Sequence, residues 1–273
     1  MTFFDKFLRI RELGILSIII IFVIGASIID IRFLTFDSWR AVFMAIPLIL
    51  VMAMGQMMVI ICRHVDISIG SILAFAAIAI GLIFIEYPNT PLWIAIIITA
   101  TVGGIMGLVN GIIVTKFNVH SIIVTLGTLS LYRGLVFIVS GGRQIDRNDI
   151  PISIISFSQT SFLFSIPAIL IVSFIIVIIT YYVMKHTVIG REIYATGSNP
   201  VAAHLKGINV TKVTLFVFGV CGMLSGIAGL FYASRFGYVN PGVTGVGIEF
   251  IVIAGVIIGG TSITGGSGSV PGT

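Results

Sequence analysis

Charged residues are scarce in this sequence. Asp, Glu, Lys and Arg make up 9% of its 273 residues, whereas they make up about 25% of a soluble domain. Hydrophobic residues account for 58% of the chain, and the mean hydropathy is +1.19. This composition excludes a water-soluble globular protein. Several apolar windows approach the roughly 20 residues that a helix needs to cross a bilayer, so we predict an all-α, polytopic membrane helix bundle.

Cysteine is also scarce, and the motifs of common catalytic and metal sites are missing. Cys62 and Cys221 lie in apolar segments without a C-x-x-C pattern, which gives a disulfide or a metal site little support. The four histidines show no metal-ligand spacing. There is no G-x-x-x-x-G-K-[ST] phosphate-binding loop and no G-x-S-x-G nucleophile motif. We therefore expect no catalytic residue, metal, cofactor or nucleotide site in this chain.

Long polar linkers are missing too, so we predict one transmembrane domain over residues 1–273. The sequence shows about eight hydrophobic segments, over residues 13–29, 41–62, 67–85, 92–114, 119–140, 163–184, 213–234 and 248–258. The last segment is too short to cross a bilayer alone. Because a glycine-rich stretch then interrupts the pattern, we also expect the sequence to be incomplete at its carboxyl-terminal end, with further helices beyond Thr273.

Basic residues are distributed unevenly between the two sides of the predicted bundle. With the amino terminus inside and the spans alternating, the inner side holds nine Lys and Arg residues and four acids, and the outer side holds five of each. Lys and Arg concentrate in cytoplasmic loops. The amino terminus and residues 185–212 are therefore predicted to be cytoplasmic. The basic excess reports orientation in the membrane and does not require a nucleic-acid partner.

The polar segment 185–212 contains the pattern of one short, capped helix. Asn199-Pro200 is a helix-start signal, and Gly207 is a helix-stop signal. The sequence thus predicts that a very hydrophobic protein presents a short basic helix to water.

One face of the segment 119–140 carries a polar stripe. Ser121, Thr125, Thr128 and Tyr132 follow one another at spacings of four, three and four residues, and Arg133 lies beside them. Polar groups inside a membrane usually face the bundle interior. The stripe either lines a translocation path, where hydroxyls suit a neutral polyhydroxylated solute, or bonds to its own helix backbone.

Two acids lie at the edges of apolar segments. Asp66 directly precedes the segment 67–85, where it is expected to cap the helix; alternatively, the corner 63–71 is a broken-helix element that lines the path. Glu249 is expected at a helix amino terminus, which the helix dipole favours. A salt bridge from Glu249 to Arg133 is the other interpretation.

Small residues recur at four-residue spacing in two spans. Gly103, Gly107 and Gly111 form one series, and Gly222 and Gly226 form another; Gly255 and Gly259 repeat the spacing in the short segment 248–258. Such spacing lets helix backbones approach closely. We interpret all of these series as packing surfaces of a tight bundle.

Three stretches together resemble the permease subunits of bacterial ABC sugar importers of the ribose, xylose and autoinducer-2 type. They read R-H-V-D-I-S-I-G-S at 63–71, G-R-E-I-Y-A-T-G-S-N-P-V-A-A-H-L-K-G-I-N-V at 190–210, and E-F-I-V-I-A-G-V-I-I-G-G-T-S-I-T-G-G-S-G-S-V-P-G-T at 249–273. The middle stretch is similar to the family's coupling region and departs from it at Val201 and His204-Leu205-Lys206.

This resemblance implies a division of labour among several subunits. Two permease subunits, as a homodimer or a heterodimer, would form the path in the bacterial inner membrane. Two cytoplasmic ABC ATPase subunits would hold ATP and Mg²⁺, and a periplasmic binding protein would deliver a monosaccharide or a similar small polyhydroxylated solute. The residues expected to couple to the ATPase are Gly190, Arg191, Glu192, Tyr194, Asn199, Pro200, Ala202, Ala203, Lys206 and Gly207. The residues expected along the path are Asp66, Ser121, Thr125, Thr128, Tyr132, Arg133 and Glu249.

Two functions of other classes stay open on the residues alone. A self-sufficient secondary transporter or channel for a small polar solute would use intramembrane acids for ion coupling, and Glu249 is the one acid inside the late apolar segment. A membrane scaffold would only anchor cytoplasmic partners. Bulky substitutions at Gly207 or Ala203 separate a transporter from a scaffold.

Overall fold

The computed structural model describes residues 11–159 and 167–273, with side chains from residue 17 onward. Within these ranges the chain is α-helical, with two short 3-10 helices and no strand. One isolated bridge joins Ile145 to Val239 through backbone bonds of 2.9 Å in each direction. The all-α prediction is therefore confirmed.

Six of the described helices are long and apolar enough to span a membrane. They are α3 (Phe36–Ile61), α4 (Ile69–Glu86), α5 (Leu92–Phe117), α6 (Ser121–Ser140), α8 (Ala168–His186) and α11 (Val210–Phe236). Two further helices are α2 (Arg11–Ile29), whose apolar part is 17–29, and α12 (Ile248–Ile258). Each corresponds to a predicted segment. The first five residues of α3 were expected in a loop, and residues 160–166 lie outside the described part.

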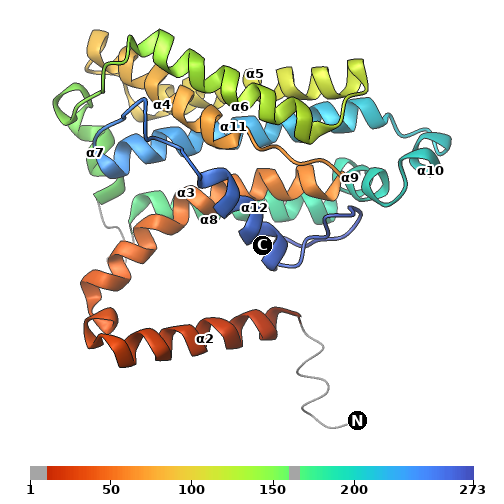
Figure 1. Ribbon diagram of the computed structural model, residues 1–273, viewed down its shortest axis with the longest axis horizontal. Helices are drawn as coiled ribbons and strands as arrows, with labels where there is room; N and C mark the ends of the chain where they lie inside the picture. The colour runs from red at the N-terminus through yellow and green to blue at the C-terminus, as the bar shows by residue number, and fades with distance from the viewer. Residues whose placement is uncertain (1–10, 160–166) are drawn as a thin grey trace.

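Helix α11 is the centre of the bundle. It packs against α5, α3 and α4, and α4 packs in turn against α6 (Figure 1). In their most apolar windows, α3 and α11 are each 72% buried and α4 is 67% buried, while α5, α6 and α8 are 28–33% buried. The first three helices thus form the interior, and the other three turn apolar side chains outward. Helix α2 lies apart from the bundle, and α3 bends between α2 and the bundle, with Pro47 inside it.

The glycine series of α5 and α11 meet where these helices cross, whereas a Cβ on Gly255 of α12 would meet nothing within 4 Å. A Cβ atom on Gly103 would overlap the carbonyl oxygen of Gly222, and a Cβ on Gly222 would overlap that of Gly103. Gly107 and Gly226 lie in the same contact. The predicted close packing is confirmed for α5 and α11, because only the absence of side chains lets these backbones touch.

The connections fall at two opposite ends of the bundle (Figure 1). At the first, which we call the α10 end, lie the exits of α3, α5 and α8 and two short helices, α9 (Val188–Ser198) and α10 (Pro200–Leu205). At the second, the α7 end, lie the exits of α4, α6 and α11 and the helix α7 (Ile152–Gln159). This arrangement groups the loops as the alternation of spans predicts.

The loop expected over 141–162 has more structure than its polar composition indicates. It contains the 3-10 helix η2 (Arg147–Asp149) and α7. Ser158 Oγ donates to the Ser234 carbonyl at 2.9 Å, and Ser234 Oγ donates to the Ile154 carbonyl at 2.5 Å. These bonds fix α7 to the end of α11. Partners about 80 residues apart stabilise it, which local sequence patterns do not show.

Candidate coupling site

The predicted short helix is present, and local hydrogen bonds set its start. Asn199 is its N-cap: Oδ1 accepts a bond from the Ala202 N–H at 3.0 Å, and Pro200 takes the first helical position. Gly207 follows the helix with φ +83, a conformation that glycine adopts without strain. Both turn signals in the sequence are confirmed as structure.

A second helix, α9, holds α10 in place, and the sequence analysis missed it. Its N-cap is Thr187, whose hydroxyl accepts from the Gly190 N–H at 3.2 Å. A Cβ on Gly190 would overlap the Met184 carbonyl at the end of α8, so glycine allows the sharp α8–α9 corner. A threonine followed by an amphipathic run was the local signal that could have revealed α9.

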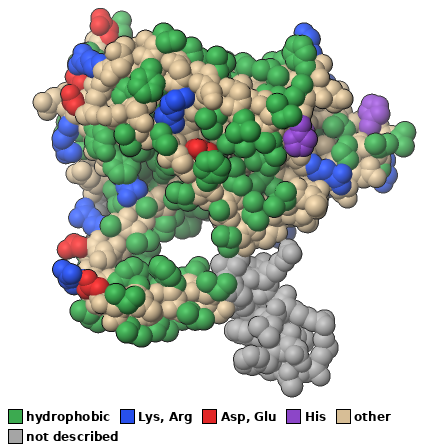
Figure 2. Space-filling model, viewed as in Figure 1, with side chains coloured by type: hydrophobic (Ala, Val, Ile, Leu, Met, Phe, Trp, Pro, Cys, Tyr) green, Lys and Arg blue, Asp and Glu red, His purple; other side chains and the backbone are tan. Residues whose placement is uncertain are grey.

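Helix α10 projects from the bundle with apolar side chains at its tip. Val201 is 70% exposed and Leu205 is 81% exposed, four residues apart on one face. Ala203 faces the opposite way and is buried. Figure 2 shows this projection, with hydrophobic and histidine side chains at the end and basic ones at its base. Val201 and Leu205, two of the four residues that depart from the family pattern, are therefore highly exposed on this helix.

The glycine-rich tail 260–273 packs against α9 and the end of α3. Tyr194 donates its hydroxyl proton to the Gly268 carbonyl at 2.9 Å, and burial raises the pKa of Tyr194, which keeps the donor protonated. The Gly266 N–H donates to the Ile61 carbonyl at 2.9 Å. The tail thereby braces the helix that precedes α10.

The connection between α3 and α4 completes this assembly. Arg63 Nε donates to the Gly197 carbonyl at 2.5 Å, and Nη2 donates to the Ser198 carbonyl at 2.6 Å. Both carbonyls belong to the last turn of α9. The three stretches that carry the family resemblance, far apart in the chain, thus meet at one place.

The inner part of this connection belongs to a buried polar network. Asp66 is 0% exposed. Its carboxylate accepts from the Ser68 N–H at 2.9 Å, from the Ser68 hydroxyl at 2.6 Å and from the Asn110 amide at 3.3 Å. The Tyr132 hydroxyl lies 3.2 Å from Asn110 Oδ1. The amide of Gln56, turned to satisfy both partners, accepts from the Asp66 N–H at 3.2 Å and donates to its carbonyl at 3.3 Å.

Comparison with known proteins identifies the class of this chain. Residues 40–273 match the family described as "Branched-chain amino acid transport system / permease component". The chain belongs to this permease family. The chain is also similar to the ribose import permease protein RbsC of Haemophilus influenzae, with 36% identity over 97% of this chain and 81% of the relative. An autoinducer 2 import system permease protein, LsrC of Yersinia pseudotuberculosis, is 32% identical over 98% of this chain and 75% of the relative. No solved structure matches.

The polar stripe of the permease faces the bundle interior. Ser121, Thr125, Thr128 and Tyr132 are all buried on α6. Thr125 Oγ1 donates to the Ser121 carbonyl at 2.9 Å and Thr128 Oγ1 to the Thr125 carbonyl at 3.4 Å, which are bonds within the helix. Ser121 Oγ accepts from the Val65 N–H at 3.1 Å. The stripe packs on the α3–α4 connection, and its role as a path stays a prediction.

The two acids and Arg133 of the permease occupy separate places. Helix α4 has Ser68 as its N-cap, so the expected capping by Asp66 is wrong in position: Asp66 bonds to the cap residue. Glu249 lies in the first turn of α12, 7% exposed, as expected for a helix amino terminus, and its carboxylate lies against Gly70. Arg133 donates to the Thr244 carbonyl at 2.6 Å and forms no ion pair with Glu249 among the described residues.

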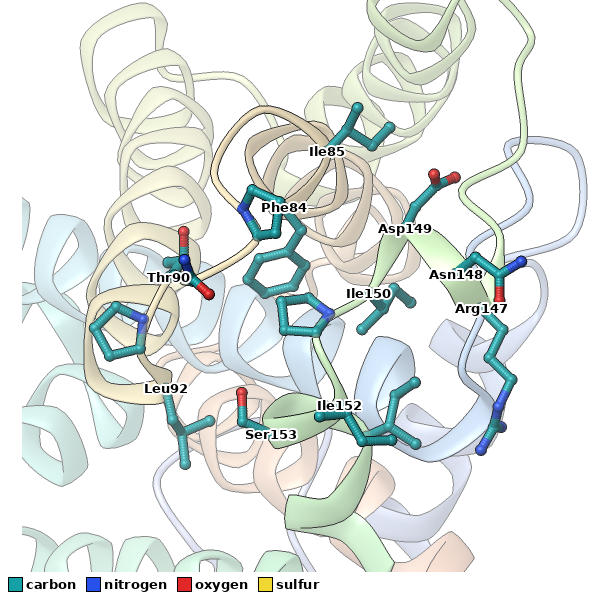
Figure 3. Close-up of a pocket in the computed structure, with 15 residues that line it drawn as sticks. Phe84, Ile85, Thr90, Leu92, Arg147, Asn148, Asp149, Ile150, Ile152 and Ser153 are labelled. Atoms are coloured by element: carbon teal, nitrogen blue, oxygen red, sulfur yellow. The ribbon is translucent and has the colours of Figure 1, made fainter.

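The permease has cavities at both ends. At the α7 end, a pocket of about 940 Å³ lies between the α4–α5 turn and the η2–α7 segment. Figure 3 shows Phe84 and Ile150 at its centre, Thr90 on one side and Asp149 on the other. At the α10 end, a pocket of about 420 Å³ is lined by His64, among others. In the part of the chain that the structure describes, no three His, Cys, Asp or Glu residues gather to hold a metal.

Proposed function

We propose that this permease is the transmembrane subunit of an ATP-driven importer for a monosaccharide or a similar small polyhydroxylated solute. The observation that carries the proposal is α10, a capped helix that projects from one end of the bundle while α9, Arg63 and the tail brace it. A braced helix moves as a rigid body and therefore transmits force. The names of the ribose and autoinducer 2 import permeases support the class of solute.

The partner at α10 is an ABC ATPase, present in two copies in the assembled importer. The exposed Val201 and Leu205 suit an apolar cleft on such a partner, and Lys206 and Lys212 add positive charge beside it. The sequence carries no phosphate-binding loop of its own. ATP and Mg²⁺ accordingly belong to the partner, whose closure would press on α9 and α10 and shift the bundle between outward-open and inward-open states.

We place the α10 end in the cytoplasm of a bacterial cell, with the inner membrane around the bundle. Among the residues whose side chains are described, from residue 17 onward, this end carries six bases and two acids. They are Arg63, Lys116, Lys185, Arg191, Lys206 and Lys212, with Asp66 and Glu192. The α7 end carries five bases and five acids, and they are Arg32, Arg40, Arg143, Arg147 and Arg235, with Asp30, Asp37, Glu86, Asp146 and Asp149. The positive-inside bias supports this orientation.

The remaining partners follow from that placement. A periplasmic binding protein would dock on the α7 end, where the larger pocket and the η2–α7 segment lie. The outward apolar faces of α5, α6 and α8 would contact lipid and a second permease subunit, identical or homologous.

Transport into proteoliposomes tests the proposal. The permease is reconstituted with the ATPase and binding-protein subunits encoded beside its gene, and uptake of radiolabelled ribose and related sugars is measured with and without ATP. We expect uptake that requires ATP and both partners. Ala203→Leu, which enlarges the side chain on the buried face of α10, should abolish uptake while the protein still inserts.

Uptake into the same vesicles also tests the alternative that this protein is a secondary transporter. Asp66 adds a second buried carboxylate to Glu249, a feature that ion-coupled transporters share. Uptake driven by a proton or sodium gradient without ATPase subunits would contradict the importer and favour a secondary transporter. Normal uptake by the Ala203→Leu variant would contradict the assignment of α10 as the coupling helix.

A further inference from the structure

The connection between α3 and α4 starts at the surface with Arg63 and then enters the bundle, where Asp66 and Ser68 are buried. Figure 1 shows it running back along the bundle before α4 begins. Ser71, in the first turn of α4, donates to the carbonyl of Leu129 in the third turn of α6 at 2.9 Å. The burial of residues 62–68 is uneven: Arg63 is exposed, His64, Val65 and Ile67 are partly buried, and Cys62, Asp66 and Ser68 are buried. Beyond Arg63 the connection is therefore non-helical backbone that enters the bundle, which a membrane protein tolerates only where protein or a water-filled cavity surrounds it.

Arg63 ties the outer end of this connection to α9. The last carbonyls of a helix have no partner within the helix and carry partial negative charge. The Arg63 guanidinium satisfies two of them, those of Gly197 and Ser198, immediately before Asn199 caps α10. Arg63 has φ 66, a left-handed conformation that is unfavourable for a residue other than glycine. Arg63 thus combines this unfavourable backbone conformation with two side-chain bonds to α9.

The inner end of the connection is bonded to the two helices beside it. The Val65 N–H donates to Ser121 Oγ of α6 at 3.1 Å. The Val65 carbonyl lies 3.3 Å from Thr125 Oγ1, which shares its one proton between this carbonyl and the nearer Ser121 carbonyl at 2.9 Å. Asp66 then bonds to Asn110 of α5 at 3.3 Å. These contacts make residues 63–68 a continuous hydrogen-bonded path from α9 to α5 and α6.

We propose that Arg63 is the positioning residue that transmits movement of α9 and α10 to the interior of the bundle through the connection 63–68. This inference rests on the proposed function as the ATPase-coupled permease. A shift of α9 pulls on the Arg63 guanidinium, and the connection carries that shift to Ser121, Thr125 and Asn110. Helix α9 reaches α3 and α11 by packing as well, but Arg63 is the group that holds its last turn by two directional bonds.

The test compares uptake with ATP hydrolysis in the full reconstituted importer. Arg63→Gly removes the guanidinium and relaxes the left-handed backbone, so backbone strain cannot account for its effect. Arg63→Lys keeps the charge but replaces the two-pronged donor with a single ammonium. Lys116→Gln, at the exposed end of α5 on the same side, is the matched control for loss of one positive charge.

We expect Arg63→Gly to hydrolyse ATP within about twofold of the wild type while the sugar taken up per ATP falls about tenfold, the scale of coupling between two linked sites. Arg63→Lys should lie between this variant and the wild type, and Lys116→Gln should match the wild type. If Arg63→Gly does not insert, the ratio for Arg63→Lys decides the question.

The inference would be overturned if Arg63→Gly took up as much sugar per ATP as the wild type. If Arg63→Gly does not insert, the same result for Arg63→Lys would overturn it. Parallel loss of uptake and hydrolysis together with a lower melting temperature would also overturn it, because Arg63 would then serve stability alone. The proposed function fails in a different way, since the wild-type protein itself would show no ATP-dependent uptake.

Discussion

At the residue scale, helix α10 depends on very few groups. It has six residues, so the Asn199 cap supplies a large share of its hydrogen bonds. Helix α11 starts with the same arrangement, in which Asn209 Oδ1 accepts from the Lys212 N–H at 3.0 Å. The two cap bonds are equally long, since the bond from the Ala202 N–H to Asn199 Oδ1 is also 3.0 Å. The two capped helices differ in length and burial, because α11 has 27 residues and is mostly buried.

This pair yields a controlled prediction. Asn199→Ala should destabilise α10 locally by about 1 kcal/mol, the usual contribution of such a cap, and should lower ATP-dependent uptake. Hydrogen exchange of the amides at 201–206 in detergent measures the first effect. Asn209→Ala removes the equivalent bond at α11 and should leave exchange at 201–206 unchanged. Equal exchange in the wild type and in Asn199→Ala would contradict the role of the cap.

At the element scale, periodicity and turn signals predicted the long helices because those helices are determined locally. Apolar runs near 20 residues and breakers such as Gly207 require no knowledge of the rest of the chain. Helices α7 and α9 were not predicted. Distant groups hold both in place, although α9 also carries a local signal in its Thr187 cap. Tyr194 reaches Gly268, and Ser158 reaches Ser234, across more than 70 residues each. The candidate site also combines local and distant determinants. Helix α10 was predictable from local signals, whereas the bonds from Arg63 that hold α9 join distant residues and were not.

The crossing of α5 and α11 allows a prediction about elements. Gly222→Val should destabilise the fold by about 1–3 kcal/mol. The added Cβ would overlap the Gly103 carbonyl, so the two helix backbones would have to separate. Thermal unfolding in detergent measures the loss. Gly127→Ala in α6 is the control, since a Cβ there meets nothing within 4 Å, and it should melt at or slightly above the wild-type temperature. A Gly222→Val variant as stable as the wild type would show that the crossing is loose.

At the scale of the whole molecule, the sequence located the polar residues along the chain but not their depth in the bundle. The sequence predicted Asp66 as the cap of the segment 67–85, with a path-lining corner over 63–71 as the alternative, and neither interpretation located its bonding partners. The structure buries it, since residues 62–68 turn back between α5 and α6, where Asn110 and Ser68 bond to its carboxylate. Such a path through the interior depends on partners from three helices and leaves no local periodicity to detect.

The orientation of the whole molecule is the last prediction, and the native cysteines make it direct to test. Cys62 and Cys221 are buried, so the wild-type protein should not react with a membrane-impermeant maleimide. Val201→Cys places a thiol on exposed α10, and Asn148→Cys places one on the exposed loop at the α7 end. If the unequal charge of the two ends sets the topology, Val201→Cys reacts in inside-out vesicles and Asn148→Cys reacts in cells with a permeabilised outer membrane. The reverse pattern would place α10 in the periplasm, out of reach of an ATPase, and would contradict both the orientation and the coupling role that depends on it.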